Sequence, residues 1–124
     1  MAENVYNGIH HICVKVKDIQ SCVDFYTQEL GYKIRFQWDG GALLRGPEGV
    51  HLEFFPEDSQ SGYAHVANNC SDVDEAYRSA VARGCESVDA PGDFTIPSNP
   101  PLKVRYSFIK DPQGNIIELF HECN

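Results

Sequence analysis

The stretch Ile9-His10-His11-Ile12-Cys13-Val14-Lys15-Val16 decides the fold, because its side chains alternate in character along the chain. Successive side chains of a β-strand point to opposite faces of the sheet. The apolar residues at even positions from Ile12 to Val16 share one face, and His11, Cys13 and Lys15 share the other. The apolar face must pack against a helix. The stretch therefore predicts a strand that turns a histidine toward the other, concave side of a sheet.

A helix is expected after this strand, since Asp18 can cap its N-terminus and apolar residues recur at helical spacing as far as about Gln28. Gly31 can end the helix because glycine adopts the left-handed conformation without steric cost. Two glycine-centred turns then separate three short β-rich runs, which indicates hairpins. These runs are residues 32–38, 42–45 and 50–55. The predicted order is β-α-β-β-β.

The second half of the chain repeats this order. Strands are expected at residues 63–68, 85–88, 104–109 and 115–120, and a helix begins at Ser71 or Asp72 and ends at Gly84. Superposing His11 on His65 also superposes Asp18 on Asp72. The sequence therefore predicts an α+β fold of one domain, residues 1–124, with two tandem βαβββ modules at about 9–56 and 63–121. The modules are expected to form a cupped mixed sheet with the helices on its outer face.

The segment Ala90–Lys103 holds four prolines and has no counterpart of similar length in the first half. We expect a loop here, which is either an inert surface loop or a flap over a pocket.

Composition narrows the functional classes. The net charge is -8, with 18 acidic and 10 basic residues, which argues against nucleic acid and anionic membranes as partners. The chain has no apolar run of membrane-spanning length and no secretory signal at its start, so a cytoplasmic location is expected. Five cysteines without a CxxC pair predict free thiols. Each half exposes a sheet that needs a partner, and a homodimer is therefore expected.

Strand phase places His11, Glu53 and Glu118 on the concave face, and His65 occupies the repeat position equivalent to His11. Glu118 is flanked two residues away on either side by Ile116 and Phe120, an apolar setting where a carboxylate is costly unless it is paired or bound. Two imidazoles and two carboxylates suit a first-row divalent ion, and the two negative charges offset those of the ion. The alternative is four separate polar residues that each find their own partners.

The remaining histidines and Cys13 are weaker candidates for metal ligands. His51 shares the face of Glu53 and is expected to line the cavity behind the ligands. His10 lies on the apolar face of the first strand, so it is expected on the helix side or at an edge. His121 has the opposite phase to Glu118. Cys13 shares the face of His11, either as a thiol near the ion or as simple cavity lining.

Two motifs carry a family resemblance: His11-x6-Asp18 with Phe25-Tyr26-x3-Leu30-Gly31, and His65 with Asp72-Val73-Asp74 and Asp111-Pro112-x-Gly114-Asn115-x2-Glu118-Leu119. They resemble the vicinal-oxygen-chelate superfamily, which includes glyoxalases, bleomycin-resistance proteins and dioxygenases, and the likeness runs from Ile9 to Phe120. This fold hosts many reactions. The order His, Glu, His, Glu most resembles glyoxalase I (lactoylglutathione lyase).

The resemblance implies a metal-dependent lyase or isomerase that acts on a small carbonyl or thiohemiacetal substrate. One divalent ion (nickel, cobalt, zinc, manganese or iron) would stabilise an enediolate, with Glu118 as the base and Glu53 as the second candidate. Lys15 stands where glyoxalase I has an arginine for a substrate carboxylate, so substrate contacts are expected from Lys15, Cys13 and His51. Two alternatives remain, which are an iron-dependent ring-cleaving dioxygenase and a non-catalytic binder of small molecules such as drugs.

Overall fold

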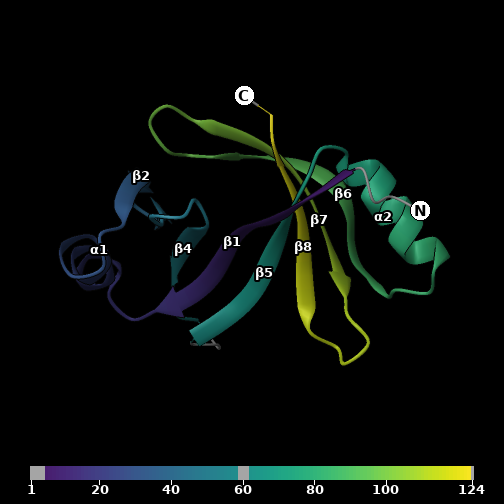
Figure 1. Cartoon of the computed structure of the whole chain (residues 1–124), viewed down its shortest axis with the longest axis horizontal. Coiled ribbons are helices and arrows are strands. Elements are labelled where there is room, and N and C mark those ends of the chain that lie inside the picture. Colours follow the sequence, from purple (N-terminus) through teal and green to yellow (C-terminus); the bar gives the residue numbers. More distant parts are fainter. Residues whose placement is uncertain (1–4, 59–61, 124) are drawn as a thin grey trace. The chain divides into compact units, whose positions relative to one another are not determined.

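The computed structural model describes residues 5–58 and 62–123, which form two helices and eight strands (Figure 1). The first βαβββ module consists of β1 (Tyr6–Val16), α1 (Ile19–Gln28), β2 (Lys33–Trp38), β3 (Gly41–Arg45) and β4 (His51–Pro56). The second consists of β5 (Gly62–Cys70), α2 (Val73–Ala82), β6 (Ser87–Ile96), β7 (Leu102–Lys110) and β8 (Ile116–Glu122). The α+β class and the tandem modules are confirmed.

The chain divides into two compact units, of which the first comprises residues 11–64. Its strand order is β2-β3-β4-β1, with β1 parallel to β4 and the other pairs antiparallel. The apolar stripe of α1 covers one face, where Val23 packs with Ala42, Leu44 and Phe54. Asp18 caps α1 as predicted, since its Oδ1 accepts the backbone N–H of Ser21 at 3.1 Å.

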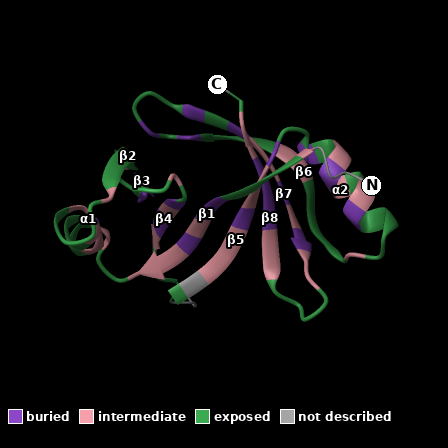
Figure 2. Ribbon diagram, in the orientation of Figure 1, coloured by how far each residue is buried: buried purple, intermediate pink, exposed green. Residues whose placement is uncertain are grey.

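The second unit combines residues 65–124 with the N-terminal part of β1. Its strand order is β5-β8-β7-β6, and β5 runs parallel to β8. Figure 2 shows buried and exposed bands along α2, whose buried residues Val73, Ala76 and Ala80 pack with Leu119. Asp72 caps α2 as predicted, because Oδ1 accepts the N–H of Glu75 at 3.0 Å. Neither helix in the described residues is long and apolar enough to span a membrane.

The two modules share one strand register. In the first, Cys13 of β1 pairs with Glu53 of β4, and in the second, Ala67 of β5 pairs with Glu118 of β8. Cys13 follows His11 by two residues, and Ala67 follows His65 by two residues. Each glutamate therefore lies opposite the equivalent position of its module. Side chains two residues apart share a face. Each module thus presents its histidine and its glutamate together, on the face that the helix does not cover.

The prediction of a loop at residues 90–103 is wrong. Residues 87–96 form β6, which pairs antiparallel with β7, and only residues 97–101 connect the two strands. The pairing shifts register between Ser87 and Asp89 and again between Asp89 and Gly92. Pro91 lies at the second shift, where a bulge removes the need for its missing N–H. The strand also has an unpaired outer edge, where prolines are tolerated.

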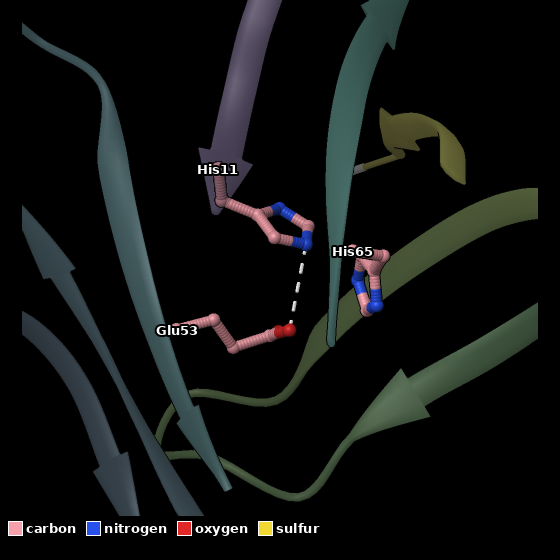
Figure 3. A group of neighbouring side chains, drawn as sticks. All are labelled: His11, Glu53 and His65. Atoms are coloured by element: carbon pink, nitrogen blue, oxygen red, sulfur yellow. Dashed lines mark ion pairs between the residues drawn. The ribbon is translucent and has the colours of Figure 1, made fainter. Parts of the chain in front are cut away.

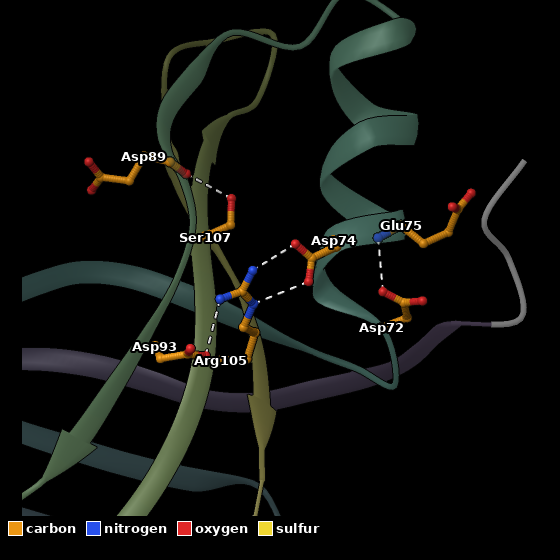
Figure 4. A network of polar contacts seen from close by, with 7 residues as sticks. All are labelled: Asp72, Asp74, Glu75, Asp89, Asp93, Arg105 and Ser107. Carbon is orange, nitrogen blue, oxygen red and sulfur yellow. Dashed lines mark hydrogen bonds and ion pairs between the residues drawn. The ribbon is translucent and has the colours of Figure 1, made fainter.

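A polar network holds the N-terminal turn of α2 to the β6–β7 hairpin (Figure 4). Arg105 of β7 donates to both carboxylate oxygens of Asp74 at 2.8 and 3.1 Å, and to Asp93 of β6 at 3.1 Å. The Ser107 hydroxyl donates to the backbone oxygen of Asp89 at 2.8 Å. The hydrogen bond from Arg105 lowers the pKa of the Asp74 carboxyl below its usual value.

We expect Asp74→Asn to lower the urea midpoint at pH 7. A carboxylate with a lowered folded-state pKa stabilises the fold above its ordinary pKa of about 3.9, and this contribution is lost as the pH falls through the lowered value. The difference from the wild type should therefore shrink below about pH 4. Asp89→Asn removes the same charge from β6, at a residue that enters this network through its backbone oxygen, and should leave the midpoint nearly unchanged. Equal loss in both variants would contradict the role of this network.

Candidate metal centre

The first unit contains a buried imidazole–carboxylate pair. His11 of β1 is 1% exposed and Glu53 of β4 is 5% exposed. Figure 3 shows the ion pair between them, in which the Nε2 atom of His11 lies 3.4 Å from Oε1 of Glu53. Because β1 and β4 are parallel neighbours, their register fixes this approach. The sequence-based assignment of both residues to one face of this unit is confirmed.

The second unit contains the equivalent pair. The Nε2 atom of His65 on β5 lies 3.0 Å from Oε1 of Glu118 on β8, and both side chains are largely buried. The ring of Phe108 meets the imidazole of His65 edge-on, with their centroids 5.3 Å apart. Phe120 is buried on the same side of β8 as Glu118. The apolar setting predicted for the Glu118 carboxylate is therefore confirmed.

Within each pair, the distance between the imidazole nitrogen and the carboxylate oxygen suits two ligands of the same ion. Two atoms that each lie about 2.1 Å from a metal are about 3.0 Å apart at a right angle and about 3.4 Å apart at the tetrahedral angle. The two measured separations, 3.0 and 3.4 Å, fall at these values. Imidazole and carboxylate are also the ligand types that first-row divalent metals accept. Each unit thus carries a His–Glu pair that fits a metal, while the convergence of all four residues on a single ion stays a prediction.

The three expected substrate contacts differ in their surroundings. Cys13 is 1% exposed and is the register partner of Glu53, so it shares that face. Lys15 donates from Nζ to Oδ2 of Asp58 at 2.8 Å, and this pairing offsets its charge. Roles for these residues in substrate binding stay predictions. All five cysteines are free, as expected.

His51 pairs in register with His11 and is buried. The Nη1 atom of Arg35 lies 3.3 Å from Nε2 of His51. A guanidinium can only donate, so this contact requires His51 Nε2 to be without a proton. Arg35 was missed by sequence reasoning because the β2–β3 pairing shifts register between Ile34 and Phe36. At such a bulge the alternation of faces fails.

His10 and His121 lie outside the metal pairs. His10 was expected on the helix side or at an edge, and in the structure its Nε2 atom lies 2.5 Å from Oε2 of Glu122. Its ring also packs on Phe120, with centroids 4.5 Å apart. His121 approaches the backbone oxygen of Cys70 through Nδ1 at 2.9 Å. The His10–Glu122 pair joins residues 112 positions apart, which strand alternation cannot predict.

Several known proteins resemble this chain in sequence or in fold. The uncharacterized protein YaeR of Escherichia coli is 26% identical over 131 residues, covering 92% of this chain and 95% of that relative. The Mn(II)-bound glyoxalase from Novosphingobium aromaticivorans has a similar fold, with a TM-score of 0.73, 19% identity, and coverage of 94% of this chain and 39% of that chain. Methylmalonyl-CoA epimerase from Mycobacterium tuberculosis also has a similar fold, with a TM-score of 0.69 and 20% identity. The match covers 97% of this chain and 91% of that chain.

The sequence model of one family matches nearly the whole chain, from residue 8 to residue 119. The matched span includes all four predicted metal ligands. The chain therefore belongs to the Glyoxalase/Bleomycin resistance protein/Dioxygenase superfamily.

Proposed function

We propose that the protein is a metal-dependent lyase or isomerase of the glyoxalase I type, with one divalent ion held by His11, Glu53, His65 and Glu118. The observation that carries the proposal is the duplicated pair. Each module brings a largely buried imidazole within 3.0 or 3.4 Å of a buried carboxylate, at the same register position. Membership of a superfamily that includes glyoxalases supports this proposal.

The donor set fits nickel, cobalt, zinc, manganese or iron. Two carboxylates neutralise the two charges of such an ion, so that four largely buried groups can stay away from water at small electrostatic cost. The glyoxalase from Novosphingobium aromaticivorans binds Mn(II) on a similar fold, which supports a divalent ion here.

The proposed reaction moves a proton between two adjacent carbons, one of which begins as a carbonyl. The ion, when bound, supplies a Lewis acid for the negative charge that develops on the substrate oxygen. Glu118 would accept the proton from the hydroxyl-bearing first carbon and return it to the second, while the hydroxyl proton passes to the former carbonyl oxygen. The change is an internal redox step, so no external oxidant is required. Phe108 and Phe120 lie beside this carboxylate and help to exclude water from it. Glu53 is the second candidate for the base.

We expect metal-free protein to bind one Zn²⁺ or Mn²⁺ per chain in a calorimetric titration. His11→Ala and His65→Ala should each weaken binding about 100-fold or more, since loss of a ligand exceeds the cost of losing its supporting hydrogen bond. His121→Ala is the matched control and should bind as the wild type does. Two ions per chain, or a loss in only one histidine variant, would contradict a single shared ion.

We expect Glu118→Gln, at saturating metal, to lower kcat for the methylglyoxal hemithioacetal by about 10²- to 10⁴-fold, because the amide cannot accept the proton. In D₂O the wild-type product should retain protium at the carbon that receives the proton, to the extent that Glu118 returns it before exchange with solvent. Near-normal turnover in Glu118→Gln would transfer the role to Glu53, for which Glu53→Gln is the parallel test. Oxygen uptake with a catechol instead of isomerisation would favour the dioxygenase alternative.

A further inference from the structure

Two aromatic rings lie beside the Glu118 carboxylate on the neighbouring strand. In the antiparallel pairing of β7 with β8, Phe108 is opposite Glu118 and Tyr106 is opposite Phe120. Residues directly opposite each other in an antiparallel pair share a face. We call Tyr106, Phe108, Glu118 and Phe120 the Glu118 face. It lies on the side of the sheet opposite to α2, which packs on Leu119 and Ile109.

The two rings of β7 are only partly buried, although neighbouring side chains on the helix side are fully covered. Ser107 is 0% exposed and Ile109 is 6% exposed, whereas Tyr106 and Phe108 keep accessible surface. Their ring centroids are 5.8 Å apart and tilted by 60°. An aromatic pair of this kind offers a flat apolar ligand both area and edge contacts.

The opposite strand leaves room over Tyr106. Gly92 of β6 is its register partner, and a Cβ atom added there would lie 3.5 Å from the Tyr106 ring and hydroxyl. The backbone of Gly92 does not have a positive φ, so its conformation does not demand glycine. The missing side chain leaves the Tyr106 ring without a side-chain contact from this position. A larger residue at this position would cover it.

Charge on the Glu118 face also favours an apolar ligand. Arg105 of β7 has the opposite phase to Phe108 and is held on the helix side by Asp74 of α2 and by Asp93. Lys110, which shares the phase of Phe108, lies 3.3 Å from Glu86 in an ion pair. β7 carries three cations, of which Lys103 and Arg105 have the opposite phase to Phe108. Lys110 is the cation of β7 on the Glu118 face, and it is engaged with a carboxylate. An anionic group placed here would meet little net positive charge, whereas a flat apolar group would meet two rings.

We infer that the substrate carries an aryl or similarly flat apolar group next to its metal-binding oxygens, and that Phe108 and Tyr106 bind this group. The inference rests on the proposed function, because it needs an ion at the His65–Glu118 pair. Phe108 adjoins both members of that pair, since its ring contacts His65 and its register partner is Glu118. A substituent on the carbon beside the bound oxygens would therefore reach Phe108 first and Tyr106 next.

The test compares two chelators that present the same pair of oxygens, benzohydroxamate and acetohydroxamate, in calorimetric titrations of the Zn²⁺-loaded protein. We expect benzohydroxamate to bind about 5- to 100-fold more tightly, which corresponds to contacts with two rings. Phe108→Ala should reduce this preference by about 2- to 12-fold, the range for one aromatic contact. Gly92→Leu should reduce it as well, by filling the space over Tyr106.

Matched variants keep the result interpretable. Phe25→Ala removes a ring that is 53% exposed on α1, in the other unit, and should leave the preference unchanged. Phe108→Leu keeps an apolar side chain if the alanine variant fails to fold, and it should lose part of the preference. If the wild type binds both hydroxamates with equal affinity, the inference is overturned. Binding of the two compounds would in that case still support the metal site. A chain that takes no divalent ion overturns the proposed function, and this inference with it.

Discussion

The register of two parallel strand pairs is the constraint on which the rest of the structure depends. Pairing of Cys13 with Glu53, and of Ala67 with Glu118, sets which residues of β4 and β8 lie beside the histidines. A slip of one residue would turn every side chain of a strand to the opposite face. Glu53 and Glu118 would then point into the apolar layers under the helices, where nothing offsets the cost of burying a carboxylate.

This register is fixed by the apolar side chains on the helix-side face of the strands. Leu52 and Phe54 alternate with Glu53 along β4, and Phe54 packs with Val23 of α1 and stacks on Tyr26 at 5.3 Å. Burial of each large apolar side chain contributes roughly 1.5–3 kcal/mol, and a one-residue slip would lose this burial along the whole strand. The helix-side core therefore determines where the ligands lie, and the ligands need not stabilise their own positions.

The sequence predicted those features that follow from strict periodicity. Alternation along β1, β4 and β8 assigned His11, Glu53 and Glu118 to the uncovered faces, and the helix caps at Asp18 and Asp72 followed from local hydrogen bonding. Prediction failed where a bulge breaks the alternation. Arg35 lies at one such bulge. The proline-rich stretch of β6 was assigned to a loop because its extended conformation depends on pairing with β7, which its own residues do not reveal.

The duplicated halves differ beside their carboxylates, and this difference bears on which glutamate can act as the base. The antiparallel neighbour of Glu53 is Leu43, which is 1% exposed, whereas the neighbour of Glu118 is the partly exposed Phe108. Cys13, also 1% exposed, closes the other side of Glu53. A base must reach a carbon of the substrate, and among the register neighbours of the two carboxylates Phe108 alone keeps accessible surface. In the proposed reaction, this difference favours Glu118 as the base and Glu53 as a ligand of the ion.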